Sequence, residues 1–177
     1  TFQTASIFEN LTVLQNLDIA AGSGRSVLTM LRRRGSVLPQ IEEALETTGL
    51  TAERDKPAGI LAHGQKQWLE IGMLLVQNAD VLLLDEPVAG MSHEEREETG
   101  QLLQRIGGER TVVVVEHDMD FMRMFATSVT VLAAGRVLAE GTVAEVQADP
   151  KVQEVYLGTA AAGEELDQIA EEGADHA

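Results

Sequence analysis

A run of four large apolar residues that ends in two carboxylates restricts the fold of this chain more than any other stretch. The run is Val81 to Pro87, with the sequence Val-Leu-Leu-Leu-Asp-Glu-Pro. A continuous apolar run of this length predicts a strand that is buried on both faces, as in a parallel sheet. Burial of an ionised carboxylate costs on the order of several kcal/mol unless the charge is paired or meets a metal. We therefore expect Asp85 and Glu86 to lie in a cleft at the carboxyl end of the strand, where open α/β sheets bind ligands.

Adjacent carboxylates in such a cleft suit phosphate chemistry. The first, Asp85, would hold Mg²⁺, and the second, Glu86, would activate a water molecule. An apolar strand that ends at a solvated acidic turn explains this stretch equally well, so the rest of the sequence must distinguish the two interpretations.

Strands and helices alternate in the second half of the chain. Further apolar runs predict strands at 111–115 and 128–133. This alternation predicts a parallel sheet with crossover helices, and a glycine turn predicts that 136–139 returns antiparallel to the preceding strand. Capping boxes that begin helices are formed by Ser92 with Glu95 and by Thr142 with Glu145.

The first half, residues 7–77, is predicted to be mostly helical, with no strand. A capping box of Thr12 and Gln15 begins a short helix. Further helices are predicted over 25–34 and over 39–48, the second of which starts with proline and is followed by glycine.

Composition excludes several classes of function. The chain contains no cysteine, which excludes disulfides, thiolate zinc sites and thiol nucleophiles. The formal net charge is −16 and aromatic residues make up 3% of the chain, so neither charge nor base stacking favours nucleic acid. No apolar run approaches the roughly 18 residues of a membrane-spanning helix. The four histidines show no metal-site spacing.

Five segments occur in an order and at a spacing that resemble the ATPase subunits of ABC transporters. Thr1-Phe2-Gln3 resembles the Q-loop, Leu61 to Gln65 the signature motif, Val81 to Pro87 the Walker B strand, Ala89 to Ser92 the D-loop, and Glu116-His117-Asp118 the switch histidine. The resemblance covers residues 1 to about 158. It implies an α/β fold, with a partial P-loop NTPase (RecA-like) parallel sheet and a helical signature subdomain.

The implied organisation has three parts. These are a helical signature subdomain at 4–77, the C-terminal part of a RecA-like ATPase core at 78–158, and an acidic tail at 159–177 that we expect to be disordered. The sequence contains no Gly-x-x-x-x-Gly-Lys-Ser/Thr, so the P-loop strand and the antiparallel subdomain of the family are expected to be missing. Because the chain opens with Thr1 in mid-pattern, we expect it to be a C-terminal fragment.

The resemblance implies ATP and Mg²⁺ as cofactors. Asp85 and Gln3 would contact the metal, Glu86 would be the general base, and His117 would contact the γ-phosphate. Because His117 follows a second apolar strand, we expect it to lie near the same cleft as Asp85 and Glu86. A histidine that follows a strand can also be purely structural. The residues with a nucleotide-binding role would be Gln3, Leu61, Ala62, His63, Gly64, Gln65 and Ser92.

The signature motif also has a physical rationale, because it opens a helix. Free N–H groups and the positive end of the helix dipole bind phosphate, and Gly64 allows close approach of the backbone. In the family this helix completes the ATP site of the opposite subunit. The alternative is an ordinary amphipathic helix, since Trp68, Ile71 and Leu75 form a packing stripe. We expect both roles to coexist on one helix.

Three positions depart from the family pattern. Ala62 stands where serine is usual, which removes a hydroxyl donor to the γ-phosphate. His63 replaces a common glycine, and could supply a donor or crowd the site. Ser92 replaces the usual aspartate of the D-loop, so a contact across the dimer is in question.

Within the family, two segments resemble particular importers. Residues 8–13 are similar to the branched-chain amino acid type, and residues 63–73 to the urea-import subclass. This implies membrane permease subunits and a second ABC ATPase subunit as partners, an indirect link to a solute-binding protein, and a location in the cytoplasm on the inner face of the plasma membrane. No nucleic-acid partner is expected.

The missing P-loop leads to two further expectations. The chain alone should neither bind ATP tightly nor hydrolyse it. Uncovered sheet edges and apolar faces should favour a non-native dimer of the fragment. Two alternatives remain: a non-hydrolysing interaction module that lends its signature motif to a partner ATPase, and a soluble ABC-type ATPase in DNA repair or translation, which the acidic balance argues against.

Overall fold

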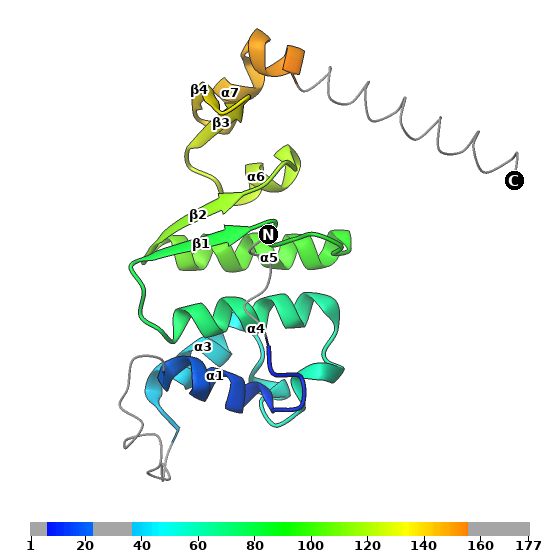
Figure 1. Ribbon diagram of the computed structural model, residues 1–177, viewed down its shortest axis with the longest axis vertical. Helices are drawn as coiled ribbons and strands as arrows, with labels where there is room; N and C mark the ends of the chain where they lie inside the picture. The colour runs from blue at the N-terminus through cyan, green and yellow to red at the C-terminus, as the bar shows by residue number, and fades with distance from the viewer. Residues whose placement is uncertain (1–6, 23–36, 156–177) are drawn as a thin grey trace, which may run out of the picture. The chain divides into compact units, whose positions relative to one another are not determined.

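The computed structural model describes residues 7–22 and 37–155, which form two compact units (Figure 1). The first unit extends through Phe125 and the second begins at Ala126. Gln3, the predicted helix at 25–34 and the acidic tail at 159–177 lie outside the described residues. No helix in the described ranges combines the length and the apolar character needed to cross a membrane.

Three α-helices build the helical part of the first unit: α1 (Val13–Gly22), α3 (Pro39–Thr48) and α4 (His63–Leu75). The predicted capping box is confirmed, because Thr12 and Gln15 exchange side-chain to backbone hydrogen bonds of 2.9 and 3.1 Å. The short 3₁₀ helices η1 (Thr51–Glu53) and η2 (Ala58–Ile60) connect α3 to α4. No strand occurs among the described residues of this part, as predicted.

The α/β part of the first unit pairs β1 (Val81–Asp85) with β2 (Thr111–Val115) in parallel. The helix α5 (His93–Gly107) forms the crossover between the strands, and α6 (Met119–Phe125) follows β2. The pairing is in register from Val81 with Thr111 to Asp85 with Val115. Both strands therefore end at the same edge, which brings their carboxyl-terminal residues together.

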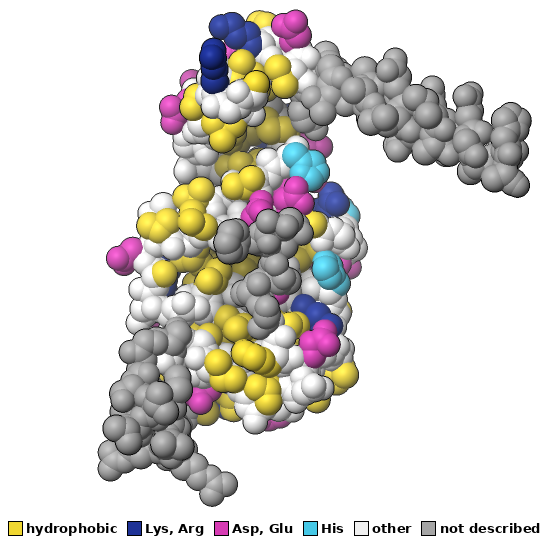
Figure 2. Space-filling model, viewed as in Figure 1, with side chains coloured by type: hydrophobic (Ala, Val, Ile, Leu, Met, Phe, Trp, Pro, Cys, Tyr) yellow, Lys and Arg dark blue, Asp and Glu magenta, His cyan; other side chains and the backbone are white. Residues whose placement is uncertain are grey.

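One face of this sheet is buried and the other is not. Leu82 and Leu84 are 1% and 7% exposed, and they belong to a core that continues into α5 and α4. Leu83 and Val115, on the opposite face, are 73% and 62% exposed, and Val81 and Val113 are also exposed. Figure 2 shows hydrophobic side chains at the surface over β1 and β2.

The prediction that the 81–84 strand is buried on both faces is therefore wrong for the described structure. An apolar run indicates that a strand can be buried on both faces. Burial also requires neighbouring elements that pack against each face. Among the described residues, packing reaches the Leu82 face and leaves the Leu83 face open. The expectation that apolar faces would be exposed is confirmed.

The second unit consists of an antiparallel hairpin and a helix. β3 (Val129–Ala133) pairs with β4 (Arg136–Gly141), and α7 (Val143–Ala148) follows. Ala134 and Gly135 both have positive φ, 49° and 73°, as a two-residue type I′ turn requires. The predicted antiparallel return is confirmed. In the described structure β3 pairs with β4 alone, so the parallel sheet contains two strands and not three.

Candidate functional site

The carboxylates at the end of β1 occupy the edge of the parallel sheet. Asp85 is the last residue of the strand and is exposed. Glu86 has a φ of 45°, which is uncommon for a residue other than glycine. Its N–H donates a 2.9 Å hydrogen bond to the carbonyl oxygen of Val115, the last residue of β2. The sheet edge thus holds Glu86 in a sparsely populated backbone conformation, as residues in functional sites often are.

The structure brings Glu86 and His117 together, from positions 31 residues apart in the chain. The Nδ1 atom of His117 lies 3.5 Å from Oε1 of Glu86. The His117 side chain is 83% exposed and that of Glu86 is 41% exposed, so both remain accessible to a ligand. A cleft of about 220 Å³ opens here, lined by Glu86, Val88, Ala89, Gly90, Arg96, Glu116, His117 and Asp118.

The turn that carries His117 is fixed by its two neighbours. The Glu116 side chain is only 3% exposed. Its Oε2 accepts a hydrogen bond from the backbone N–H of His117 at 3.2 Å, whereas its Oε1 has no hydrogen-bond partner. Asp118 accepts the N–H groups of Asp120 and Phe121, both at 3.0 Å, and so caps α6. Its second oxygen pairs with Nη1 of Arg96 at 2.9 Å.

Sequence reasoning missed Arg96 and Glu116. Arg96 lies on α5, in the part of the chain that was expected only to cross between strands. Its bond to Asp118 spans 22 residues, and no local pattern signals such a contact. Glu116 was recognised only as the residue before His117.

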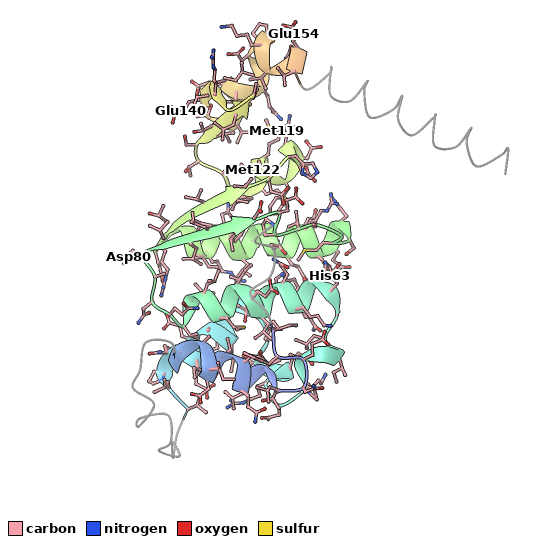
Figure 3. All side chains as sticks on the ribbon, viewed as in Figure 1. His63, Asp80, Met119, Met122, Glu140 and Glu154 are labelled. Carbon is pink, nitrogen blue, oxygen red and sulfur yellow. The ribbon has the colours of Figure 1, made fainter. Side chains whose placement is uncertain are left out.

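The predicted signature helix begins where expected. α4 starts at His63 with Ala62 as its N-cap, and Gln65 Oε1 accepts the N–H of Ala62 at 3.1 Å. His63 lies at the end of α4 on the side toward α5 (Figure 3). Its Nε2 is 2.9 Å from the carbonyl oxygen of Ala89, so this nitrogen carries the hydrogen and donates.

The backbone of the signature helix also meets α5. The N–H of Gly64 donates to Oε1 of Glu95 at 3.3 Å, while Oε2 of Glu95 accepts from both the N–H and the hydroxyl of Ser92 at 2.9 Å. These hydrogen bonds, those from Ser92 first, lower the pKa of Glu95, and His63 adds a smaller effect in the same direction. Leu61 is buried in the core, whereas Ala62, His63 and Ser92 are exposed.

No three side chains of the described residues form a cluster able to hold a metal ion by themselves. Magnesium usually binds through one or two carboxylates, with the remaining positions filled by water and substrate phosphate oxygens. Asp85 and Glu86 at the sheet edge fit that donor set. A larger cavity of about 350 Å³, lined by Gln40, Glu43, Ala44, Thr47, Leu75, Asn78, Arg105, Ile106, Glu109 and Arg110, contains none of the predicted site residues.

Comparison with known proteins gives a consistent family. The family model described as "ABC transporter" matches residues 1–89, and the model described as "Branched-chain amino acid ATP-binding cassette transporter" matches residues 136–162. The ATP-binding protein BraF of Pseudomonas aeruginosa, for high-affinity branched-chain amino acid transport, is 30% identical over 172 residues, which are 90% of this chain and 67% of BraF. The corresponding LivG of Escherichia coli is 32% identical over 171 residues, with the same coverage.

Solved structures lead to the same class of protein, the ATP-binding cassettes. One structure of the cassette MJ1267 has a TM-score of 0.74 and 28% identity, over 88% of this chain and 66% of that one. Its ADP conformation has a TM-score of 0.68 and 29% identity, over 85% of this chain and 64% of that one. The chain belongs to the ABC transporter family. It spans about two thirds of the length of these relatives.

Proposed function

We propose that this chain is the part of an ABC importer's ATP-binding subunit that carries the signature segment and the hydrolytic carboxylate. The observation that carries the proposal is the 3.5 Å approach of His117 Nδ1 to Glu86 Oε1. Both residues follow paired parallel strands, in the position where open α/β sheets place their ligands. Family membership supports the same assignment.

Each polar residue at the sheet edge has a distinct task in this proposal. Bound ATP with Mg²⁺ would supply the phosphoryl group to be transferred to water. Asp85 would hold the metal, and Gln3 would be a further contact. Glu86 would accept a proton from the attacking water as general base. His117, held beside Glu86, would donate a hydrogen bond to the terminal phosphate.

The signature segment, Leu61 to Gln65, would serve a different ATP molecule. The N–H groups at the start of α4 would bind a phosphate held in an opposite ATPase subunit, since a helix N-terminus favours anions. Leu61 would act through the core, because its side chain is buried. Ser92, through its bonds to Glu95, would place the D-loop beside this helix.

The chain alone is proposed to be inactive. A P-loop supplies the backbone amides and the lysine that hold the β- and γ-phosphates, and the 177 residues contain no such motif. The same observation favours a second candidate function, a non-hydrolysing module that lends its signature segment to a partner ATPase.

The transported solute is inferred from the relatives. BraF and LivG are named for high-affinity branched-chain amino acid transport, which supports branched-chain amino acids or related amides as substrates. The sequence of residues 63–73 resembles the urea-import subclass, which favours urea as a narrower alternative for the transported solute. The partners would be membrane permease subunits, a second ATPase subunit and, indirectly, a solute-binding protein, with the chain on the inner face of the plasma membrane.

Titration calorimetry with Mg-ATP tests the proposal on two proteins: this chain, and the chain extended at its amino end through the segment encoded upstream. Tight binding and hydrolysis by the extended protein alone are expected. Tight binding by the 177-residue chain would contradict the account of the site. An upstream segment without a P-loop would favour the non-hydrolysing module.

A further inference from the structure

The N-cap residue of α4 offers no side-chain acceptor to the free N–H groups of the helix, although Gln65 Oε1 accepts the N–H of Ala62. An N-cap side chain normally accepts a hydrogen bond from the N–H two or three residues further on. The N-cap of α4 is Ala62, which has no side-chain oxygen and makes no such bond. The donor two residues on is the N–H of Gly64, and it bonds instead to Glu95 of another helix, at 3.3 Å.

A single carboxylate therefore caps two helices. Oε2 of Glu95 completes the capping box of α5 with Ser92, and Oε1 faces Gly64 at the start of α4. A negative charge at this place is favourable to both helices, because both dipoles have their positive ends there. The lowered pKa of Glu95 has the same hydrogen bonds as its causes. The packing is close, since a Cβ atom at position 64 would lie 2.6 Å from Oε1.

The neighbouring contact keeps the two helix ends together. His63 precedes Gly64, and its Nε2 donates to the carbonyl oxygen of Ala89 at 2.9 Å. Gly90 follows with a φ of 73°, and a Cβ atom there would lie 3.4 Å from the same His63 nitrogen. The loop that leads to Ser92 is thus held against α4, and with it the carboxylate of Glu95.

We propose that Glu95 is an internal anion that competes with phosphate for the N-terminus of α4. The inference rests on the proposed function, in which this helix receives a phosphate of ATP. A phosphate oxygen that bonds to Gly64 N–H must first displace Oε1 of Glu95, because one N–H does not serve two anions equally. The displacement leaves the capping box of α5 intact, since that box uses the other oxygen. Glu95 therefore sets how readily the signature helix accepts a phosphate group.

Titration of the ¹⁵N-labelled full chain with inorganic pyrophosphate tests this, with the amide signal of Gly64 as the readout. Glu95→Gln removes the charge and still fits a capping box, whose last position takes either Glu or Gln. We expect it to bind pyrophosphate about two- to fivefold more tightly than the wild type, as the size of charge effects at helix ends implies. Glu94→Gln, on the same turn and exposed, is the matched control and should leave the affinity within about the experimental error of the wild type.

The outcomes separate the inference from the proposed function. If the amide signal of Gly64 shifts in both proteins but the wild type and Glu95→Gln bind pyrophosphate equally tightly, Glu95 does not compete with phosphate. The proposed phosphate site at α4 would then still be supported. No shift at Gly64 in any protein overturns both. Thermal melting checks that each variant folds. If Glu95→Gln does not fold, Glu95→Asp replaces it, because the shorter side chain reaches less far toward Gly64, and an unchanged affinity in that variant also overturns the inference.

Discussion

Trp68 and Thr99 join α4 to α5 through a partly buried hydrogen bond. The indole Nε1 of Trp68 donates to Oγ1 of Thr99 at 2.9 Å, and that hydroxyl in turn donates to the carbonyl oxygen of Glu95 at 2.7 Å. Thr99 is completely buried. The bond therefore helps to fix the distance between the helix that opens with the signature segment and the helix that supplies Glu95.

Replacing Thr99 by valine should destabilise the first unit. Valine has nearly the same shape but offers no acceptor, so the indole N–H loses its partner in a largely buried position. A buried donor without a partner costs about 1–3 kcal/mol. Urea unfolding followed by the fluorescence of Trp68, the one tryptophan of the chain, measures the change. Thr111→Val, at an exposed strand position, is the matched control and should change the free energy of unfolding by less than about 0.5 kcal/mol. An equal loss of stability in both variants would count against a stabilising role of the hydrogen bond between Trp68 and Thr99.

Glu70 should destabilise the first unit at neutral pH. Burial raises its pKa, and the nearby His63 offsets part of that rise. Because the pKa of Glu70 is higher in the folded state than in the unfolded state, protonation of Glu70 favours folding. This contribution to stability is complete below the unfolded-state pKa and is lost as the pH rises through the folded-state pKa. Glu70→Gln should therefore be more stable than the wild type at pH 7 and equal to it near pH 3. Urea unfolding at both pH values measures this, with Glu98→Gln as the control for removal of one exposed charge. A constant difference at both pH values would contradict the assignment.

The exposed face of the parallel sheet should promote self-association. Leu83 and Val115 are 73% and 62% exposed on adjacent strands, and contiguous apolar surface of this kind favours contact between copies. Replacing both by threonine keeps a residue suited to strands and removes apolar area. Sedimentation velocity should show a smaller associated fraction for the double variant than for the wild type. Leu132→Thr, at an exposed position of the second unit, should leave association unchanged. A wild type that sediments as a monodisperse monomer would refute this.

Local sequence signals predicted the helix starts correctly. The capping boxes at Thr12, Ser92 and Thr142 each join residues three apart, and all three are present. The parallel pairing of 81–85 with 111–115 and the antiparallel return after Gly135 also followed from apolar runs and turn residues. These features depend on neighbours in the chain, which a single sequence displays.

Contacts between distant residues were not predictable in the same way. Gly64 meets Glu95 across 31 positions and His63 meets Ala89 across 26, and neither pair has a spacing rule. The exposure of Leu83 was missed because an apolar residue looks the same whether or not a neighbour covers it. The meeting of Glu86 with His117 was anticipated from the rule that parallel strands end at one edge, although their roles in hydrolysis stay a prediction.

Glu86 and His117 should act as one unit in hydrolysis. Their side chains approach to 3.5 Å, so each orients the other. In a protein that joins this chain to a P-loop segment, Glu86→Gln should lower kcat by about 10²–10⁴-fold with ATP affinity retained, since glutamine keeps the shape and cannot accept the proton. His117→Ala should lower kcat as well, and the double variant should lose little more than the worse single variant, because residues that work together are not additive. His93→Ala, at an exposed position of α5, is the matched control and should keep full activity. Steady-state ATPase rates of the four variants and the parent measure this cycle. Losses that multiply in the double variant would mean that the two side chains act independently despite their contact.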